Sequence, residues 1–153
     1  MRAVQADRFG APEVLGLTEV PEPEPSAGQV KIAVRSASVI YGDVIVRSGR
    51  YPRPLPWIPG IEVAGEVVRI GPEVDESLLG ATVVATTAGP LGIVFRKSDA
   101  EQRGDAEWAL AAAGRGELRP RIHARHPLGR AADAHRELEE RRNVGAIVLS
   151  VGQ

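Results

Sequence analysis

Side chains that could carry out chemistry gather between positions 41 and 62 of this sequence. Glu62 could serve as a general acid or base if partial burial raised its pKa; a hydrogen-bonded structural glutamate at the start of a strand is the alternative. Tyr41, Tyr51 and Trp57 are three of only six aromatic residues in the chain. As a cleft lining they would form an apolar wall with polar tips, which suits a flat small molecule. The alternative is a small core that fixes the surrounding proline-rich loop, and both readings need the same packing.

Two further sets of polar residues have spacings that predict structural roles. Asp43 and Arg47 are four residues apart on a predicted short helix, a spacing that predicts an ion pair on one helix face. His123 and His126 are three apart on a predicted strand, so we expect them on opposite faces, where they would make a poor metal site. His135 falls on the apolar face of a predicted helix, and we interpret it as a satisfied core histidine.

The sequence argues against two classes of cofactor site. The chain has no cysteine, which excludes disulfides, thiolate catalysis and the usual cysteine-rich zinc sites. No glycine-rich turn between a strand and a helix is present to hold a pyrophosphate. The stretch 89–92 fails because Pro90 has no amide donor, and the stretch 113–116 follows a helix rather than a strand. We therefore expect no metal and no dinucleotide cofactor.

The composition is typical of a globular domain. Of the 153 residues, 43 % are hydrophobic and 25 % are charged, and the formal net charge is −1. A nearly neutral chain argues against a general electrostatic grip on nucleic acid. The N-terminus has no apolar signal core, and no apolar run is long enough to span a bilayer. We expect a cytoplasmic protein that does not cross a membrane.

Apolar periodicity and turn residues predict a mainly β chain with peripheral helices, an α+β fold. In the first half the predicted strands are Ala3–Ala6, Val14–Val20, Gln29–Val39, Glu62–Ile70 and Thr82–Thr86. A helix is expected over Tyr41–Ser48, followed by an ordered proline-rich loop over 51–60. In the second half we expect a strand over Leu91–Phe95, a helix from Ser98 to Ala113, a strand over Arg121–Arg125, a helix from Pro127 to Arg142 and a strand over Ile147–Leu149.

Several motifs together resemble one known family. In the first 86 residues they are Met1-Arg2-Ala3-Val4, the run 9–15 (Phe-Gly-Ala-Pro-Glu-Val-Leu), the run 37–43, the run 47–52 and the run 59–65. Near the end they are the runs 116–120, 126–128, 134–135 and 145–149. On these motifs the chain resembles the zinc-independent quinone oxidoreductases of the medium-chain dehydrogenase/reductase superfamily. The first block is similar to their catalytic, GroES-like domain and the second to their C-terminus.

The resemblance gives meaning to the short segment between the two blocks. Family members are roughly twice as long and carry a Rossmann domain there, typically well over about 100 residues. Here Ala85–Gly89 runs almost directly into the strand expected at Leu91–Phe95, which resembles the last Rossmann strand, and 99–114 resembles the final helix. The resemblance therefore implies one GroES-like domain over 1–153. We expect a partly open β-barrel from parts 1–88 and 117–153, with a vestigial strand–helix remnant at 89–116.

The same resemblance bears on the site residues. Family members often have Asn where this chain has Ile40, and some have Tyr where it has Ile45, both near the nicotinamide. Two polar groups are therefore apolar where a redox cofactor would need orientation. This favours a non-redox enzyme, an isomerase or cyclase acting on an enone or polyketide-like substrate. In this hypothesis Glu62, Tyr41 and Tyr51 are catalytic, and Ile40, Asp43, Ile45 and Trp57 contact the substrate.

The alternative hypothesis is a domain without its own catalysis. It would be a non-catalytic substrate-binding domain or a truncated piece of an NADPH-dependent quinone or enone reductase. Under either hypothesis we expect a homodimer through Leu91–Phe95, because Ile93 and Phe95 would otherwise leave an exposed apolar sheet edge.

Overall fold

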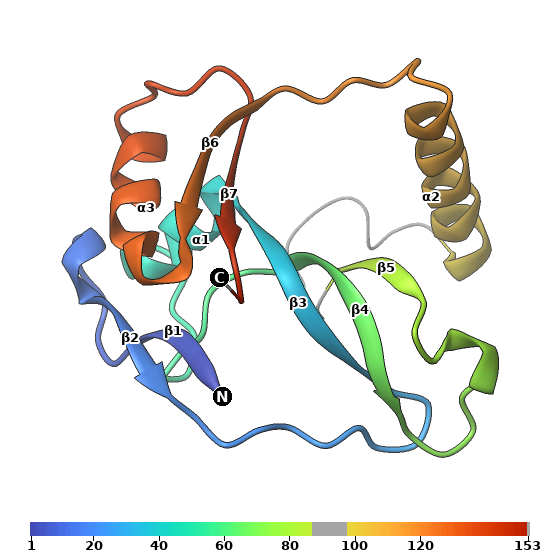
Figure 1. Cartoon of the computed structure of the whole chain (residues 1–153). Helices are drawn as coiled ribbons and strands as arrows, with labels where there is room; N and C mark the ends of the chain where they lie inside the picture. The colour runs from blue at the N-terminus through green and yellow to red at the C-terminus, as the bar shows by residue number, and fades with distance from the viewer. Residues whose placement is uncertain (87–97, 153) are drawn as a thin grey trace. The chain divides into compact units, whose positions relative to one another are not determined.

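A computed structural model describes residues 1–86 and 98–152 of the chain (Figure 1). The chain forms two compact units, a larger one from 1–87 with 122–153 and a smaller one from 88–121. The strands of the larger unit are β1 (Arg2–Ala6), β2 (Leu15–Glu19), β3 (Val30–Val39), β4 (Glu62–Ile70), β5 (Thr82–Thr86), β6 (Ile122–Pro127) and β7 (Ala146–Ser150). Its helices are α1 (Tyr41–Arg47) and α3 (Ala131–Glu139), and α2 (Asp99–Gly114) belongs to the smaller unit. The fold is mainly β with peripheral helices, as predicted.

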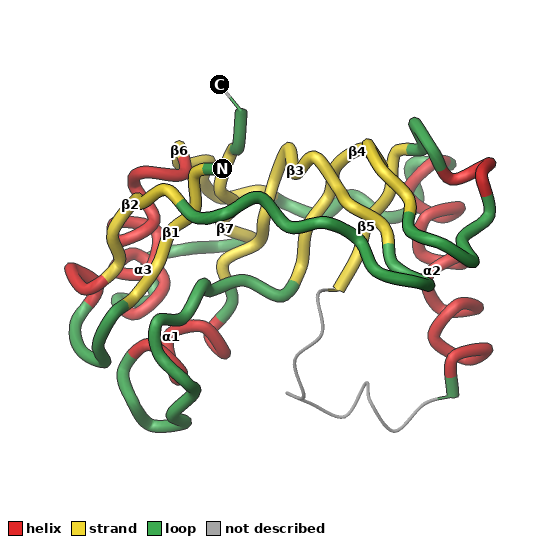
Figure 2. Tube along the Cα trace, turned by 90° about the horizontal axis from the view of Figure 1, so that it is seen from below, coloured by secondary structure: helices red, strands yellow, loops and turns green. Residues whose placement is uncertain are grey.

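Two sheets build the larger unit. β1 and β2 form an antiparallel hairpin, and the other sheet has the order β5-β4-β3-β7-β6. All pairings in this sheet are antiparallel except β6 with β7. Figure 2 shows the strands of both sheets in yellow. Because the two sheets do not share a strand pairing, the strands do not close into a barrel.

β3 and β4 approach each other closely around Gly65. This glycine lies opposite Val34, and a Cβ on it would lie 2.2 Å from the carbonyl oxygen of Ala33. Their register shifts twice, between Lys31 and Ile32 and between Val34 and Ser36. Across these shifts the alternation predicted for β3 persists, because Ile32 and Val34 are half-buried whereas Ala33 and Arg35 are exposed.

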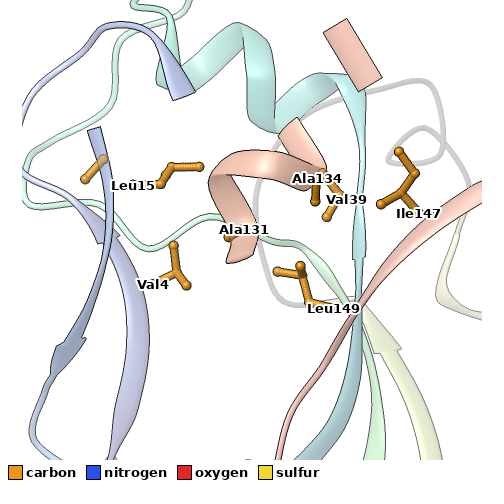
Figure 3. Packing of buried hydrophobic residues seen from close by; sticks show 8 residues of the cluster. Val4, Leu15, Val39, Ala131, Ala134, Ile147 and Leu149 are labelled. Atoms are coloured by element: carbon orange, nitrogen blue, oxygen red, sulfur yellow. The ribbon is translucent and has the colours of Figure 1, made fainter. Parts of the chain in front are cut away.

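The apolar core of the larger unit lies between the hairpin, α3 and the β3–β7 pair. Its buried members are Val4, Ala6, Leu15, Val39, Ala131, Ala134, Ile147 and Leu149 (Figure 3). The residues that α3 contributes to this cluster are small, which lets its backbone lie close to the strands. Trp57 and Leu128 pack against the cluster from its margin.

The predicted helix from Pro127 to Arg142 is wrong at both ends. Pro127 belongs to β6, where it pairs with Ser150 of β7, and a 3₁₀ turn at Leu128–Arg130 separates the strand from α3. Tertiary strand pairing therefore overrides the preference of proline for the first turn of a helix. After Glu139 the helix ends, and Arg141 adopts a left-handed φ of 53° that cannot continue it.

The smaller unit contains the helix that the sequence predicts. Ser98 is the N-cap of α2: its hydroxyl accepts from the amide of Glu101, and the Glu101 carboxylate accepts from the amide of Ser98 at 2.8 Å. This reciprocal capping fixes the start of the helix by local contacts alone. The strand predicted at Leu91–Phe95, and the dimer predicted through it, lie outside the described residues.

Arg47 is the most enclosed charged side chain of the core region, with 1 % of its surface exposed. One guanidinium nitrogen donates to the carbonyl of Gly10 at 3.0 Å and another to the carboxylate of Glu139 at 2.6 Å. The predicted Asp43–Arg47 ion pair is therefore wrong, because Asp43 accepts from the amides of Ile40 and Gly60 instead. Arg47 thus joins α1 to α3 and to the turn at Gly10.

We expect Glu139→Ala to destabilise the fold by about 2 kcal/mol, because it leaves the Arg47 guanidinium buried without its anion. The value lies below that of a fully buried pair since 33 % of the Glu139 side chain is exposed. The matched control is Glu66→Ala, which breaks the exposed pair with Arg35 and should cost less than about 1 kcal/mol. Urea unfolding of both variants measures the difference, and equal losses would contradict the structural role of Arg47.

Candidate functional site

A cavity of about 390 Å³ lies in the larger unit, between the hairpin and the five-stranded sheet. Its innermost lining is apolar and buried: Val4, Val39, Ala131 and Leu149. Ile32 and Val34 also line it, so the face of β3 that the sequence predicts to be buried faces this space instead of a filled core. A volume of this size is within the range of small-molecule sites.

The mouth of the cavity carries charge. Exposed Arg2 and Glu22 line it, together with Lys31, whose ammonium lies 2.6 Å from the carboxylate of Glu22. Exposed Ile58 and Val68 complete this rim with apolar surface. The cavity therefore has a polar rim around an apolar interior, the usual arrangement of a ligand pocket.

Asp43 is a buried carboxyl in the cavity wall, with 3 % of its surface exposed. Its two oxygens accept hydrogen bonds from the backbone amides of Ile40 and Gly60, both at 3.1 Å. Burial raises the pKa of Asp43 above its ordinary value, the two backbone hydrogen bonds oppose that shift, and the charge of Glu62 adds to it. Asp43 therefore fixes the start of α1 and the turn at Gly60.

The carboxylate of Glu62 contacts the cavity wall at Ser38. The Ser38 hydroxyl donates to the Glu62 carboxylate at 2.6 Å, and Ser38 lines the cavity whereas Glu62 is exposed at the start of β4. A hydroxyl held by a carboxylate can pass a proton between that carboxylate and a ligand. The catalytic role predicted for Glu62 stays a prediction, and any such role would be exerted through Ser38.

The predicted aromatic wall does not line the cavity. Tyr41 and Tyr51 are each 46 % exposed, and Arg53 lies over the Tyr51 ring at 5.3 Å from its centroid. Trp57 is half-buried beside the core, and its backbone makes two hydrogen bonds with Ala6, at 2.8 and 2.9 Å. Trp57 thus helps to fix the proline-rich loop.

Ile40 and Ile45 are the apolar residues predicted to contact substrate. Ile40 directly precedes α1, and Ile45 lies within it. Both are half-buried, and neither lines the cavity. Of the seven residues predicted for the site, Asp43 alone is in the cavity lining. The roles predicted for the other six residues stay predictions.

His135 also lines the cavity, although its place in the sequence predicts only a core histidine. It is buried with 2 % of its surface exposed, as expected for a core histidine, but the prediction that it is satisfied is wrong, because Nδ1 is enclosed and has no hydrogen-bond partner among the described residues. Burial and the positive charge of Arg47 lower its pKa to about 4, so the imidazole is neutral at pH 7. Its place on the apolar face of a helix was visible in the sequence, whereas its missing partner depends on tertiary contacts.

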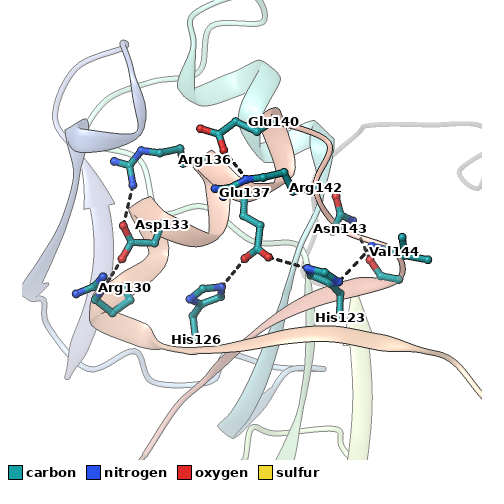
Figure 4. A network of polar contacts seen from close by, with 11 residues as sticks. His123, His126, Arg130, Asp133, Arg136, Glu137, Glu140, Arg142, Asn143 and Val144 are labelled. Atoms are coloured by element: carbon teal, nitrogen blue, oxygen red, sulfur yellow. Dashed lines mark hydrogen bonds and ion pairs between the residues drawn. The ribbon is translucent and has the colours of Figure 1, made fainter.

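His123 and His126 do not point to opposite faces, so that prediction is wrong. Their Nε2 atoms lie 2.7 and 2.9 Å from the two carboxylate oxygens of Glu137 on α3 (Figure 4). His123 sits at an irregularity in the pairing of β6 with β7, which breaks the alternation on which the prediction rested. Among the described residues, no group of three such side chains is placed to hold a metal ion.

This His123–Glu137–His126 contact fastens β6 to α3. The amide of Val144 donates to Nδ1 of His123 at 3.2 Å, which assigns the ring proton to Nε2 and directs it at Glu137. The hydrogen bond from His126 is the main reason that the pKa of Glu137 lies below its ordinary value.

Within the described part of the chain, no helix has the length and apolar character needed to cross a bilayer.

Comparison with known proteins shows which of them this fold and sequence are similar to. The family model of the alcohol dehydrogenase GroES-like domain matches residues 26–126. The quinone oxidoreductase of Lama guanicoe is 37 % identical over 115 residues, covering 73 % of this chain and 31 % of that protein. The quinone oxidoreductase of Pseudomonas aeruginosa is 38 % identical over 92 residues, covering 60 % and 28 %. The matched part thus spans about a third of the length of these relatives.

A solved structure supports the same fold. The quinone oxidoreductase from Coxiella burnetii superposes with a TM-score of 0.81 at 16 % identity, covering 99 % of this chain and 99 % of that one. At this identity the likeness shows the fold alone. It confirms the predicted mainly β, GroES-like architecture, and the strands of the described residues do not form a closed barrel.

We expect His135 to make the fold less stable in acid. Its pKa is about 4 when folded and 6.5 ordinarily, so between these values the unfolded chain binds a proton that the folded chain does not. Stability therefore falls as the pH drops through this window, by about 1.4 kcal/mol per pH unit. Urea unfolding of the wild type and His135→Phe measures this, because other groups cancel in the difference between the two proteins. The stability of the wild type relative to His135→Phe should fall by about 3 kcal/mol from pH 7 to pH 4; a constant difference contradicts the prediction.

Proposed function

This chain belongs to the alcohol dehydrogenase GroES-like domain family, and from that premise we propose that it is a quinone-oxidoreductase-like protein that binds a small quinone or enone in its cavity. The observation that carries this proposal is the cavity of about 390 Å³, apolar and buried inside, with Ser38 and Asp43 in its wall. An apolar pocket with few polar groups orients a small ligand through those groups. The relatives named as quinone oxidoreductases support the choice of ligand class.

The proposed chemistry is non-redox. We infer that the nucleotide-binding part of the ancestral enzyme has been lost, since no glycine-rich strand–helix turn occurs in the sequence. Isomerisation or cyclisation of an enone removes a proton at one position and returns one at another, so it needs no electron donor. The hydrogen-bonded pair of Ser38 and Glu62 supports such a transfer, because Ser38 meets the ligand and Glu62 is the base behind it. The catalytic roles of Tyr41 and Tyr51 stay predictions, because neither side chain lines the cavity.

A non-catalytic substrate-binding domain is the second candidate, as a separate domain or as a piece of an NADPH-dependent reductase. The observation that favours it is the exposure of Glu62, Tyr41 and Tyr51, none of which lines the cavity. The relatives are about three times as long as the part matched here, which agrees with this candidate. Both candidates share ligand binding in the cavity and differ in proton transfer. The cytoplasmic location and the homodimer stay predictions.

We expect Val34→Phe to weaken binding of 1,4-naphthoquinone at least about tenfold, since the ring would fill the cavity that Val34 lines. Isothermal titration calorimetry measures the dissociation constant. The matched control is Val84→Phe, which places the same ring on β5 at a residue that is 58 % exposed and outside the cavity lining. Unfolding midpoints confirm that both variants fold. Equal binding by both variants, or no binding by the wild type, contradicts the proposal.

We expect Glu62→Gln to slow proton exchange without changing affinity. The probe is 2-cyclohexenone in D₂O, and NMR follows deuterium uptake at the carbons activated by its carbonyl. Loss of a general base lowers such a rate by about 100-fold or more, and Ser38→Ala should act in the same direction because it breaks the link to the cavity. Glu66→Gln on the same strand is the control. If the wild type does not accelerate exchange, or Glu62→Gln leaves it unchanged, the non-catalytic candidate is favoured.

A further inference from the structure

We propose that His135 holds an oxygen atom of the ligand, so that the cavity selects carbonyl- or hydroxyl-bearing ring compounds over hydrocarbons of the same shape. This inference rests on the proposed function, because it specifies how the same cavity recognises its ligand. It assigns to α3 a recognition role in the interior of the fold.

The imidazole has unused hydrogen-bonding capacity. Neither ring nitrogen of His135 makes a hydrogen bond to a described residue. Among the described side chains, the enclosed nitrogen and oxygen atoms without partners are Arg47 Nε and His135 Nδ1. Nε2 of His135 is not among them, and His135 is a lining residue of the cavity. Nε2 is therefore the atom that a ligand can reach.

The surroundings of His135 would suit an apolar side chain better than an imidazole. Its neighbours on α3 and in the cavity interior are Ala131, Ala134, Val39 and Leu149, all buried. A buried polar group without a partner costs stability, and an apolar residue of similar size would avoid that cost. An unpaired imidazole in such a setting calls for an explanation, and a bound ligand oxygen would complete its hydrogen bonding.

The charges around the ring determine which kind of oxygen fits. Arg47 acts on the ring from the α1 side, where it is held by Glu139 and Gly10, and it helps to keep the imidazole neutral. A neutral imidazole offers one donor and one acceptor. It can therefore donate to a carbonyl or pair with a hydroxyl, but it brings no charge of its own to attract an anion. A quinone, an enone or the corresponding hydroxyl compound meets this requirement.

The test compares two ring compounds of equal shape, 1,4-naphthoquinone and naphthalene, which differ in their oxygens. Calorimetry with the wild type should give at least about tenfold tighter binding of the quinone. In His135→Phe that preference should fall to about twofold or less, while naphthalene binds the variant as well as it binds the wild type. His135→Asn, a second variant that retains a polar group, covers the case in which phenylalanine disturbs folding; it should show an intermediate preference. A preference for the quinone that is as large in both variants as in the wild type overturns the inference.

A direct measurement on the unaltered protein needs no variant. The chain has three histidines, so their ring nitrogens can be resolved by ¹⁵N NMR. The His135 Nε2 resonance should shift on addition of naphthoquinone and stay in place with naphthalene. His123 and His126 are internal controls, because their Nε2 atoms are already bonded to Glu137. A fixed His135 signal in the presence of bound quinone overturns this inference and leaves the proposed function standing. Failure of both compounds to bind the wild type overturns both.

Discussion

The buried guanidinium of Arg47 is the constraint around which the larger unit is arranged. A charge this enclosed must be paired and hydrogen-bonded within the fold, and Arg47 meets that demand with the carbonyl of Gly10 and the carboxylate of Glu139. Those partners lie 37 and 92 residues away in the chain. The position of α1 therefore depends on α3 and on the first turn at once. Burial lowers the pKa of His135, and the charge of Arg47 adds to that effect.

The cavity is the second consequence of how the elements meet. The hairpin and the five-stranded sheet share no strand pairing, and α3 closes the space between them with small residues, Ala131 and Ala134. This arrangement leaves Ile32 and Val34 facing an open volume. It also places the hydroxyl of Ser38 in the wall, in contact with the exposed carboxylate of Glu62. A packed core and a cavity thus lie side by side in one unit.

The sequence predicted those elements whose determinants are local. β4 and β5 have the predicted bounds, and Ser98 caps α2 through a residue three positions away. The helix after β6 begins later than predicted. Helix preference favours Pro127 in a first helical turn, but its pairing with Ser150 keeps it in the strand. The Asp43–Arg47 pair failed for a related reason. Each of those buried charges needs partners; backbone amides bind Asp43, whereas Glu139 and the carbonyl of Gly10 bind Arg47.

The sequence by itself determined the family resemblance, the mainly β character and the absence of thiol chemistry, because motifs, periodicity and residue types are properties of neighbouring positions. It also supplied Asp43 and Glu62 as carboxyls of interest. The tertiary structure alone decided which of them is buried, that Ser38 connects Glu62 to the cavity, and that Nδ1 of His135 has no partner among the described residues. Each of these depends on groups brought together from distant positions, since burial and hydrogen-bond satisfaction are set by what surrounds a side chain in space.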